Sequence, residues 1–87
     1  MLQNLCRITL PSGVVVEWPQ PETSAPPNGT VCFVPNWLFA TCTVSNLWSG
    51  DQYDFNFLKR GMLHLSEQAA IKHAEALILI SGGMCDG

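Results

Sequence analysis

Residues 61–83 constrain the fold more than any other part of the chain. They read as a short extended segment, a helix cap, one amphipathic helix and a pair of glycines. Ser66 is a suitable N-cap, because its hydroxyl can accept a hydrogen bond from a free amide of the first turn. Glu67 favours the positive end of the helix dipole, and the glycines can adopt the positive φ that stops a helix. The sequence therefore predicts a helix over residues 67–80.

The predicted helix has a broad apolar face and a narrower polar face. At about 100° per residue, the apolar face collects Ala69, Ala70, His73, Ala74, Leu77 and Ile80. Half of these residues are alanines, whose small side chains let a helix axis lie close to a sheet. We therefore expect the helix to cover one face of a β-sheet.

The N-terminal third reads as a β-hairpin followed by a loop. Residues 5–10 and 14–18 are β-favouring runs on either side of a proline–serine–glycine turn, and this arrangement predicts a hairpin. Residues 19–29 contain four prolines, which remove amide donors and favour extended backbone. We interpret this stretch as a surface loop.

The middle of the chain predicts further strands. Residues 30–34 and 37–44 are β-favouring, and residues 62–65 are short and extended. Residues 53–57 alternate aromatic and polar side chains, so they fit either a fifth strand or a helical turn. One side of the run over 37–44 is more uniformly apolar, and we expect it to face inward: Leu38, Ala40, Cys42 and Val44.

These elements together predict an α+β fold, in which an antiparallel sheet of four to five strands has one C-terminal α-helix packed on one face. At 87 residues the chain is short enough for a single domain. Its expected parts, in order, are an N-terminal β-hairpin over 1–18, a proline-rich loop over 19–29, further strands over 30–65, the helix over 66–81 and a flexible tail over 82–87.

The composition is very apolar for so small a domain. Hydrophobic residues make up 47% of the chain and charged residues 13%, whereas a typical soluble domain has about 25% charged residues. A small domain has much surface and little interior, so part of the apolar material has to lie outside. We expect it to form a patch that another polypeptide covers, with Trp37, Phe39 and Trp48 as anchoring side chains.

Charge and hydropathy argue against two classes of partner. The formal net charge is −3, and Lys59-Arg60 is the single basic pair, whereas nucleic-acid binding usually needs a basic stripe. The longest strongly apolar run, residues 76–80, is far shorter than the ~18 residues of a membrane span. No signal-peptide pattern is visible at the N-terminus. We therefore expect no nucleic acid, no membrane and a cytoplasmic location.

The residue types that carry chemistry are few and poorly placed. The four cysteines form no C-x-x-C pair, so we interpret them as reduced and mostly buried. His64 and His73 lack a placed carboxylate or thiolate for a metal site, and His73 reads as a core or interface residue with one ring nitrogen hydrogen-bonded. Asp51 and Asp54 read as solvated turn residues. The sequence thus predicts no catalytic, cofactor-binding or metal-binding residue.

One enzymatic alternative stays open. A thiolate could act as a nucleophile if Cys42 or Cys85 lay within hydrogen-bond reach of His64 or His73. A small cysteine-dependent enzyme of this kind would also need an oxyanion hole, and nothing in the spacing of these residues supports one.

The C-terminal two thirds of the chain carry a set of short motifs: a P-x-G-T turn, a tryptophan–glycine–aspartate stretch, a glycine before a V/L-H-L-T/S segment, and a helix of the form A-x-x-H-A-x-A-L. The matching residues are Pro27, Gly29, Thr30, Trp48, Gly50, Asp51, Gly61, Leu63, His64, Leu65, Ser66, Ala70, His73, Ala74, Ala76 and Leu77. With these motifs, residues 28–82 resemble a loose group of small phage and prophage proteins. The resemblance implies a phage or prophage origin, and hence the cytoplasm of a bacterial host.

Composition and resemblance together predict a non-enzymatic phage accessory protein that binds a host or phage protein. We expect steric blocking through an apolar surface, with a host enzyme or defence complex as the inhibited partner. The alternative is a homo-oligomeric structural or assembly component of the phage. Neither function requires a cofactor.

Overall fold

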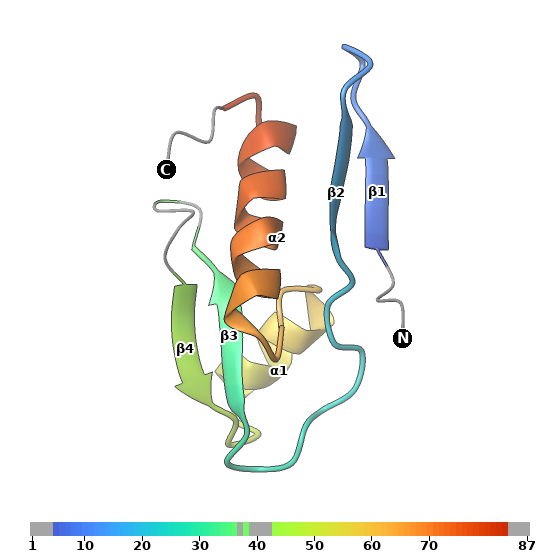
Figure 1. Ribbon diagram of the computed structural model, residues 1–87. Helices are drawn as coiled ribbons and strands as arrows, with labels where there is room; N and C mark the ends of the chain where they lie inside the picture. Colours follow the sequence, from blue (N-terminus) through green and yellow to red (C-terminus); the bar gives the residue numbers. More distant parts are fainter. Residues whose placement is uncertain (1–4, 37, 39–42, 84–87) are drawn as a thin grey trace.

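The computed structural model describes residues 5–36, 38 and 43–83, which form an α+β fold of four strands and two helices (Figure 1). In chain order the elements are β1 (Leu5–Thr9), β2 (Val15–Pro19), β3 (Val31–Pro35), β4 (Thr43–Leu47), α1 (Gln52–Lys59) and α2 (Glu67–Ile80). The α+β class is as the sequence predicts. Two antiparallel hairpins, β1–β2 and β3–β4, stand on either side of α2.

The N-terminal hairpin is confirmed. β1 and β2 pair antiparallel, with Ile8 opposite Val16. The Leu10 amide donates a hydrogen bond of 2.8 Å to the Val14 carbonyl and closes the ladder at the turn. Gly13 has a φ of +94°, a conformation that glycine adopts without steric cost. The predicted proline–glycine turn therefore sets the register of this hairpin.

The expectation of a single sheet of four to five strands is wrong, because the described strands form two separate two-stranded sheets. Residues 62–65, which we call the bridging segment, lie between them. His64 exchanges backbone hydrogen bonds with Phe33 of β3, and the Leu63 carbonyl accepts one from the Glu22 amide. Gly61, which has a positive φ, precedes the bridging segment, and Ser66, the N-cap of α2, follows it. The segment is therefore too short to form a full strand ladder with β3 or with residue 22.

Of the described residues in the predicted fourth strand over 37–44, residues 43 and 44 lie in β4 and residue 38 lies in a turn. β4 runs from Thr43 to Leu47 and pairs with β3 along its whole length. The predicted inward side is wrong at both of its described positions, because Leu38 is 77% exposed and Val44 is 51% exposed. The other two positions lie outside the described residues. Directly after β4, the indole of Trp48 is buried in the core and its amide is hydrogen-bonded to the Thr30 carbonyl. These contacts fix the pairing of β4 with β3 further along the chain than the hydrophobic pattern predicts.

Residues 53–57 belong to a helix, α1, which decides between the two structures that the sequence left open. Asp51 is the N-cap and its side chain accepts a hydrogen bond of 2.9 Å from the Asp54 amide. Phe55 lies edge-on to Trp48, with ring centroids 5.1 Å apart. The cap and this aromatic contact favour the helix over an alternating strand.

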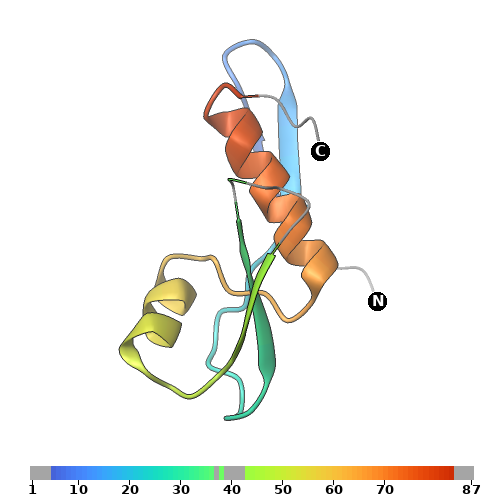
Figure 2. The same cartoon turned by 90° about the vertical axis from the view of Figure 1, so that its left-hand side faces the viewer.

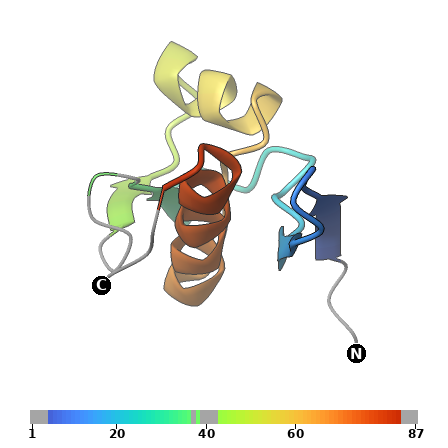
Figure 3. The same ribbon diagram turned by 90° about the horizontal axis from the view of Figure 1, so that it is seen from above.

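The C-terminal helix has the predicted bounds. The Ser66 hydroxyl accepts a hydrogen bond of 3.1 Å from the Ala69 amide, and Gly82 beyond the last turn has a φ of +88°. Figures 2 and 3 show α2 lying along the hairpins, with α1 on the opposite side of the molecule. α2 packs against β2, β3 and β4. Its buried residues are Ala69, Ala70, His73, Ala74 and Ala76.

Candidate functional site

Of the three predicted anchor residues, Trp48 lies among the described residues, and it is not exposed. Trp48 is 3% exposed and packs in the core against residues of β3 and the bridging segment. Its amide donates a hydrogen bond to the Thr30 carbonyl, which holds the backbone where the indole points inward. Trp48 is therefore a core residue in this structure and not a surface anchor. Trp37 and Phe39 lie outside the described residues, so their role stays a prediction.

One edge of strand β1 is not paired with any described strand. The hydrogen bond between Leu10 and Val14 fixes the alternation of the hairpin ladder. In an antiparallel pair, only every second residue of a strand exchanges backbone hydrogen bonds with its neighbour. The backbone N–H and C=O groups of Leu5, Arg7 and Thr9 therefore point away from β2. No other described strand pairs with this side of β1.

The free edge carries exposed apolar side chains. Leu5 is 56% exposed and Ile8 is 41% exposed. Charged side chains normally protect such an edge against pairing with other chains, but Arg7 is the single charged residue of β1 and binds Glu17 of β2 at 2.7 Å. We call the outward backbone groups of β1, together with the Leu5 and Ile8 side chains, the open β1 edge.

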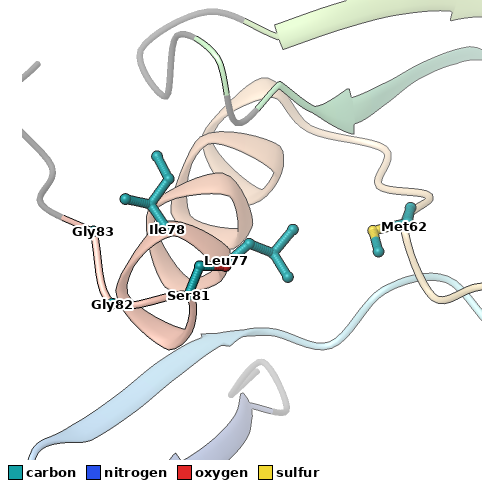
Figure 4. Close-up of a pocket in the computed structure, with 6 residues that line it drawn as sticks. All are labelled: Met62, Leu77, Ile78, Ser81, Gly82 and Gly83. Atoms are coloured by element: carbon teal, nitrogen blue, oxygen red, sulfur yellow. The ribbon is translucent and has the colours of Figure 1, made fainter.

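A second apolar feature lies beyond the last turns of α2. A groove of about 540 Å³ is lined by Met62, Leu77, Ile78, Ser81, Gly82 and Gly83. In Figure 4 the side chains of Met62, Leu77 and Ile78 lie around it. None of these described lining residues is charged. The groove offers apolar surface and one hydroxyl, which is enough for packing but supplies no group for acid–base chemistry.

The two histidines meet in the interior, next to a tryptophan that the sequence did not single out. His64 Nε2, from the bridging segment, lies 2.8 Å from His73 Nδ1 on α2. Trp18 of β2 stacks on the His73 ring, with centroids 5.7 Å apart and planes 10° apart. The prediction that His73 is a core residue with a hydrogen-bonded ring nitrogen is confirmed. We call Trp18, His64 and His73 the histidine cluster.

Both imidazoles of the cluster are neutral at pH 7. Burial lowers the pKa of His64 to about 4, with the neighbouring His73 as the second cause, and burial also lowers the pKa of His73. A hydrogen bond between two imidazoles needs one proton between them, so one facing nitrogen donates and the other accepts. The two nitrogens that face each other are thereby occupied, and the described residues contain no group of three or more side chains that could hold a metal ion.

Asp54 is a buried carboxylate, which corrects its interpretation as a solvated turn residue. It is 2% exposed and accepts hydrogen bonds from the Asn46 side chain, the Ser49 amide and hydroxyl, and the Gly50 amide. These bonds, led by the Ser49 amide, lower its pKa although burial acts in the opposite direction. The D-x-x-D spacing of Asp51 and Asp54 was the sequence signal for a helix start here. Asp54 holds the β4–α1 turn through these hydrogen bonds.

Of the two described thiols, Cys32 is poorly suited to act as a nucleophile. Cys32 is buried, and burial raises its pKa, followed by the nearby Asp54 and Glu22 carboxylates. Cys6 is partly exposed and unpaired. Cys42 and Cys85 lie outside the described residues, so the thiol–imidazole alternative is not tested at those positions.

The comparisons with known proteins add no assignment. Neither the scan against protein-family models nor the searches of curated proteins and of solved structures gave a match. Within the described ranges, no helix has the length and apolar character that crossing a membrane requires. The candidate site therefore depends on the geometry alone, and its two parts are the open β1 edge on the surface and the histidine cluster inside.

Proposed function

We propose that this protein acts by binding another polypeptide through the open β1 edge. The observation that carries the proposal is the unprotected edge, where free backbone donors and acceptors lie beside exposed Leu5 and Ile8. An isolated two-stranded hairpin is marginally stable in water, and an added strand would complete its hydrogen bonds and cover these side chains. Leu5 and Ile8 lie three positions apart, so their side chains point to opposite faces of the strand. The partner chemistry that fits is therefore an extended segment with apolar side chains on both faces.

The low content of charged residues supports the same function. Burial of an apolar surface of this kind favours association with another polypeptide. Together with the resemblance of residues 28–82 to phage proteins, it favours an accessory protein of phage origin that blocks a host enzyme or defence complex. The bound host or phage protein would contribute the strand that extends the β1–β2 sheet.

A homo-oligomer is the second candidate, and the register of β1 favours it. If two copies pair antiparallel around Ile8, the two isoleucines face each other and each Arg7 lies opposite Thr9 of the second copy. A pairing centred on Arg7 would instead place two like charges directly opposite each other, which is destabilising. The edge is thus compatible with itself in the register centred on Ile8, as an assembly component requires.

Replacing Ile8 by lysine is expected to weaken partner binding by roughly 10- to 100-fold, because a charge would replace an apolar contact worth about 1–3 kcal/mol. Affinity capture from host lysate, followed by a binding titration with the captured protein, measures the effect. Tyr53→Lys is the matched control, since it adds the same charge at an exposed position on α1.

Light scattering of the wild-type protein separates the two candidates. A partner captured by wild type and by Tyr53→Lys but lost with Ile8→Lys supports heterologous binding. A dimer that Ile8→Lys dissociates supports the homo-oligomer. A monomer that captures no stoichiometric partner would contradict both candidates.

A further inference from the structure

The histidine cluster links α2 to both hairpins through side chains, and the proposed function does not use it. His64 sits on the bridging segment, whose backbone is hydrogen-bonded to β3 through Phe33. His73 sits on α2, and Trp18 sits on β2. The three rings therefore connect α2 to both hairpins in a fold where the hairpins themselves share no ladder.

We propose that the histidine cluster is an acid-sensitive latch: it holds α2 on the two hairpins while both imidazoles are neutral, and protonation of the rings releases the helix. The latch is independent of the open β1 edge. It is a property of the fold itself and does not require a partner.

The geometry makes protonation act in two steps. The first proton binds an outward nitrogen, either Nδ1 of His64 or Nε2 of His73, so the hydrogen bond at 2.8 Å survives but a charge enters the interior. The second proton makes both facing nitrogens donors, because each imidazolium carries a proton on both of its nitrogens. Two N–H groups that point at each other repel at the present 2.8 Å between the nitrogens, so the rings separate.

Trp18 opposes the first step in part. A cation over an indole face is favourable by about 0.5–1 kcal/mol at ring distances up to about 6 Å, and the His73 ring stacks on Trp18 at 5.7 Å. Burial outweighs this attraction, since the pKa of His73 is lowered. We therefore expect His73 to take the first proton and His64 the second.

The charged groups around the cluster decide whether a carboxylate could hold the protonated rings in place. The charged residues on the elements packed around the cluster are Glu17 on β2, Glu67, Lys72 and Glu75 on α2, and Glu22 beside the bridging segment. β3 and the bridging segment carry none. Glu17 binds Arg7, and within the described chain no carboxylate contributes to the pKa of either imidazole.

The sign of the pH dependence follows from these directions. Each ring titrates near pH 6.5 in the unfolded chain and lower in the folded protein, so the unfolded chain binds more protons. The latch is complete above pH 6.5 and is lost as the pH falls from 6.5 towards 4. For His64 alone, with a folded pKa of about 4, the folding equilibrium constant falls roughly 20-fold between pH 7 and pH 5.

The double variant His64→Gln, His73→Asn tests the latch. A glutamine amide lies where Nε2 of His64 lies and an asparagine amide lies where Nδ1 of His73 lies, so the pair keeps one hydrogen bond and cannot titrate. Urea unfolding at pH 7 and pH 5 gives the folding equilibrium constant of each protein. We expect a decrease of at least 20-fold in wild type and less than threefold in the variant. An equal decrease in both proteins would overturn the latch.

Ring resonances of the wild-type protein give an independent result, including the case in which the double variant does not fold at pH 7. Side-chain ¹⁵N shifts are expected to report one neutral tautomer for each ring at pH 7 and a His64 ring that stays neutral down to about pH 5. We expect α2 amide protection to be lost in the same range as the rings protonate. Imidazoles that titrate near pH 6.5 while α2 stays protected would refute the proposal.

Discussion

Replacing Ala74 by glutamate is expected to unfold the protein, or to lower its melting temperature by at least about 20 °C. Ala74 is fully buried on the face of α2 that packs against the hairpins. A carboxylate there would be desolvated without a partner, which costs several kcal/mol. A domain of this size has only about 4–13 kcal/mol of stability in total. Far-ultraviolet circular dichroism during heating measures the effect.

Gln68→Glu is the matched control for this experiment. It introduces the same side chain into the same helix, but at an exposed position in the first turn. A negative charge near a helix N-terminus is favourable by about 0.3–1 kcal/mol, so the control should melt at or slightly above the wild-type temperature. If Ala74→Glu melted with the control, the packing of α2 on the two hairpins would have to be revised.

Replacing Asp54 by alanine is expected to destabilise the protein by about 3–5 kcal/mol. The carboxylate accepts four hydrogen bonds, from Asn46, Ser49 and Gly50. Its removal leaves these donors without a partner in a part-buried turn, and each lost bond to a charged group is worth about 1.5–3 kcal/mol before the turn relaxes. Urea unfolding at pH 7 gives the free energy of unfolding.

Asp51→Ala separates this network from ordinary helix capping. It removes the N-cap of the same helix while leaving the Asp54 side chain in place, and loss of a cap costs about 1 kcal/mol. Equal losses for the two variants would show that Asp54 contributes only as part of the cap.

Asp54 also predicts a loss of stability in acid, at a lower pH than the loss caused by the histidines. Its pKa is lowered from 3.8, so its stabilising contribution is present above pH 3.8 and is lost as the pH falls through the lowered value. Between pH 7 and pH 5 the carboxylate stays ionised, and the histidine cluster dominates the pH dependence of stability in that range. In wild type the free energy of unfolding should thus fall in two stages.

The local sequence could predict those parts of the fold whose ends are set by residues close together in the chain. Ser66 and Gly82 bound α2 through a cap and a positive φ, and both devices act within one turn. The β1–β2 hairpin is likewise set by a short turn between two alternating runs. The error over residues 37–44 has a different origin, because the register of β4 depends on where Trp48 and Asp54 are buried.

In the candidate site, too, the sequence predicted some features and only the tertiary structure decided others. The apolar excess of the sequence predicted a binding surface, but the aromatic anchor Trp48 lies in the core, and the exposed edge belongs to β1. The sequence predicted His73 to be a core or interface residue, yet nothing in the spacing of the two histidines indicated a shared proton or a stacked Trp18.

By itself the sequence determined the α+β class, the bounds of α2, the N-terminal hairpin and the shortage of charge, because each depends on propensity, capping or composition within a few residues. Only the tertiary structure decided that the strands divide into two hairpins, that Asp54 is buried, and that His64 and His73 face each other. The physical reason is that burial and hydrogen bonding between distant segments depend on how whole elements pack, and a linear pattern does not record which elements meet.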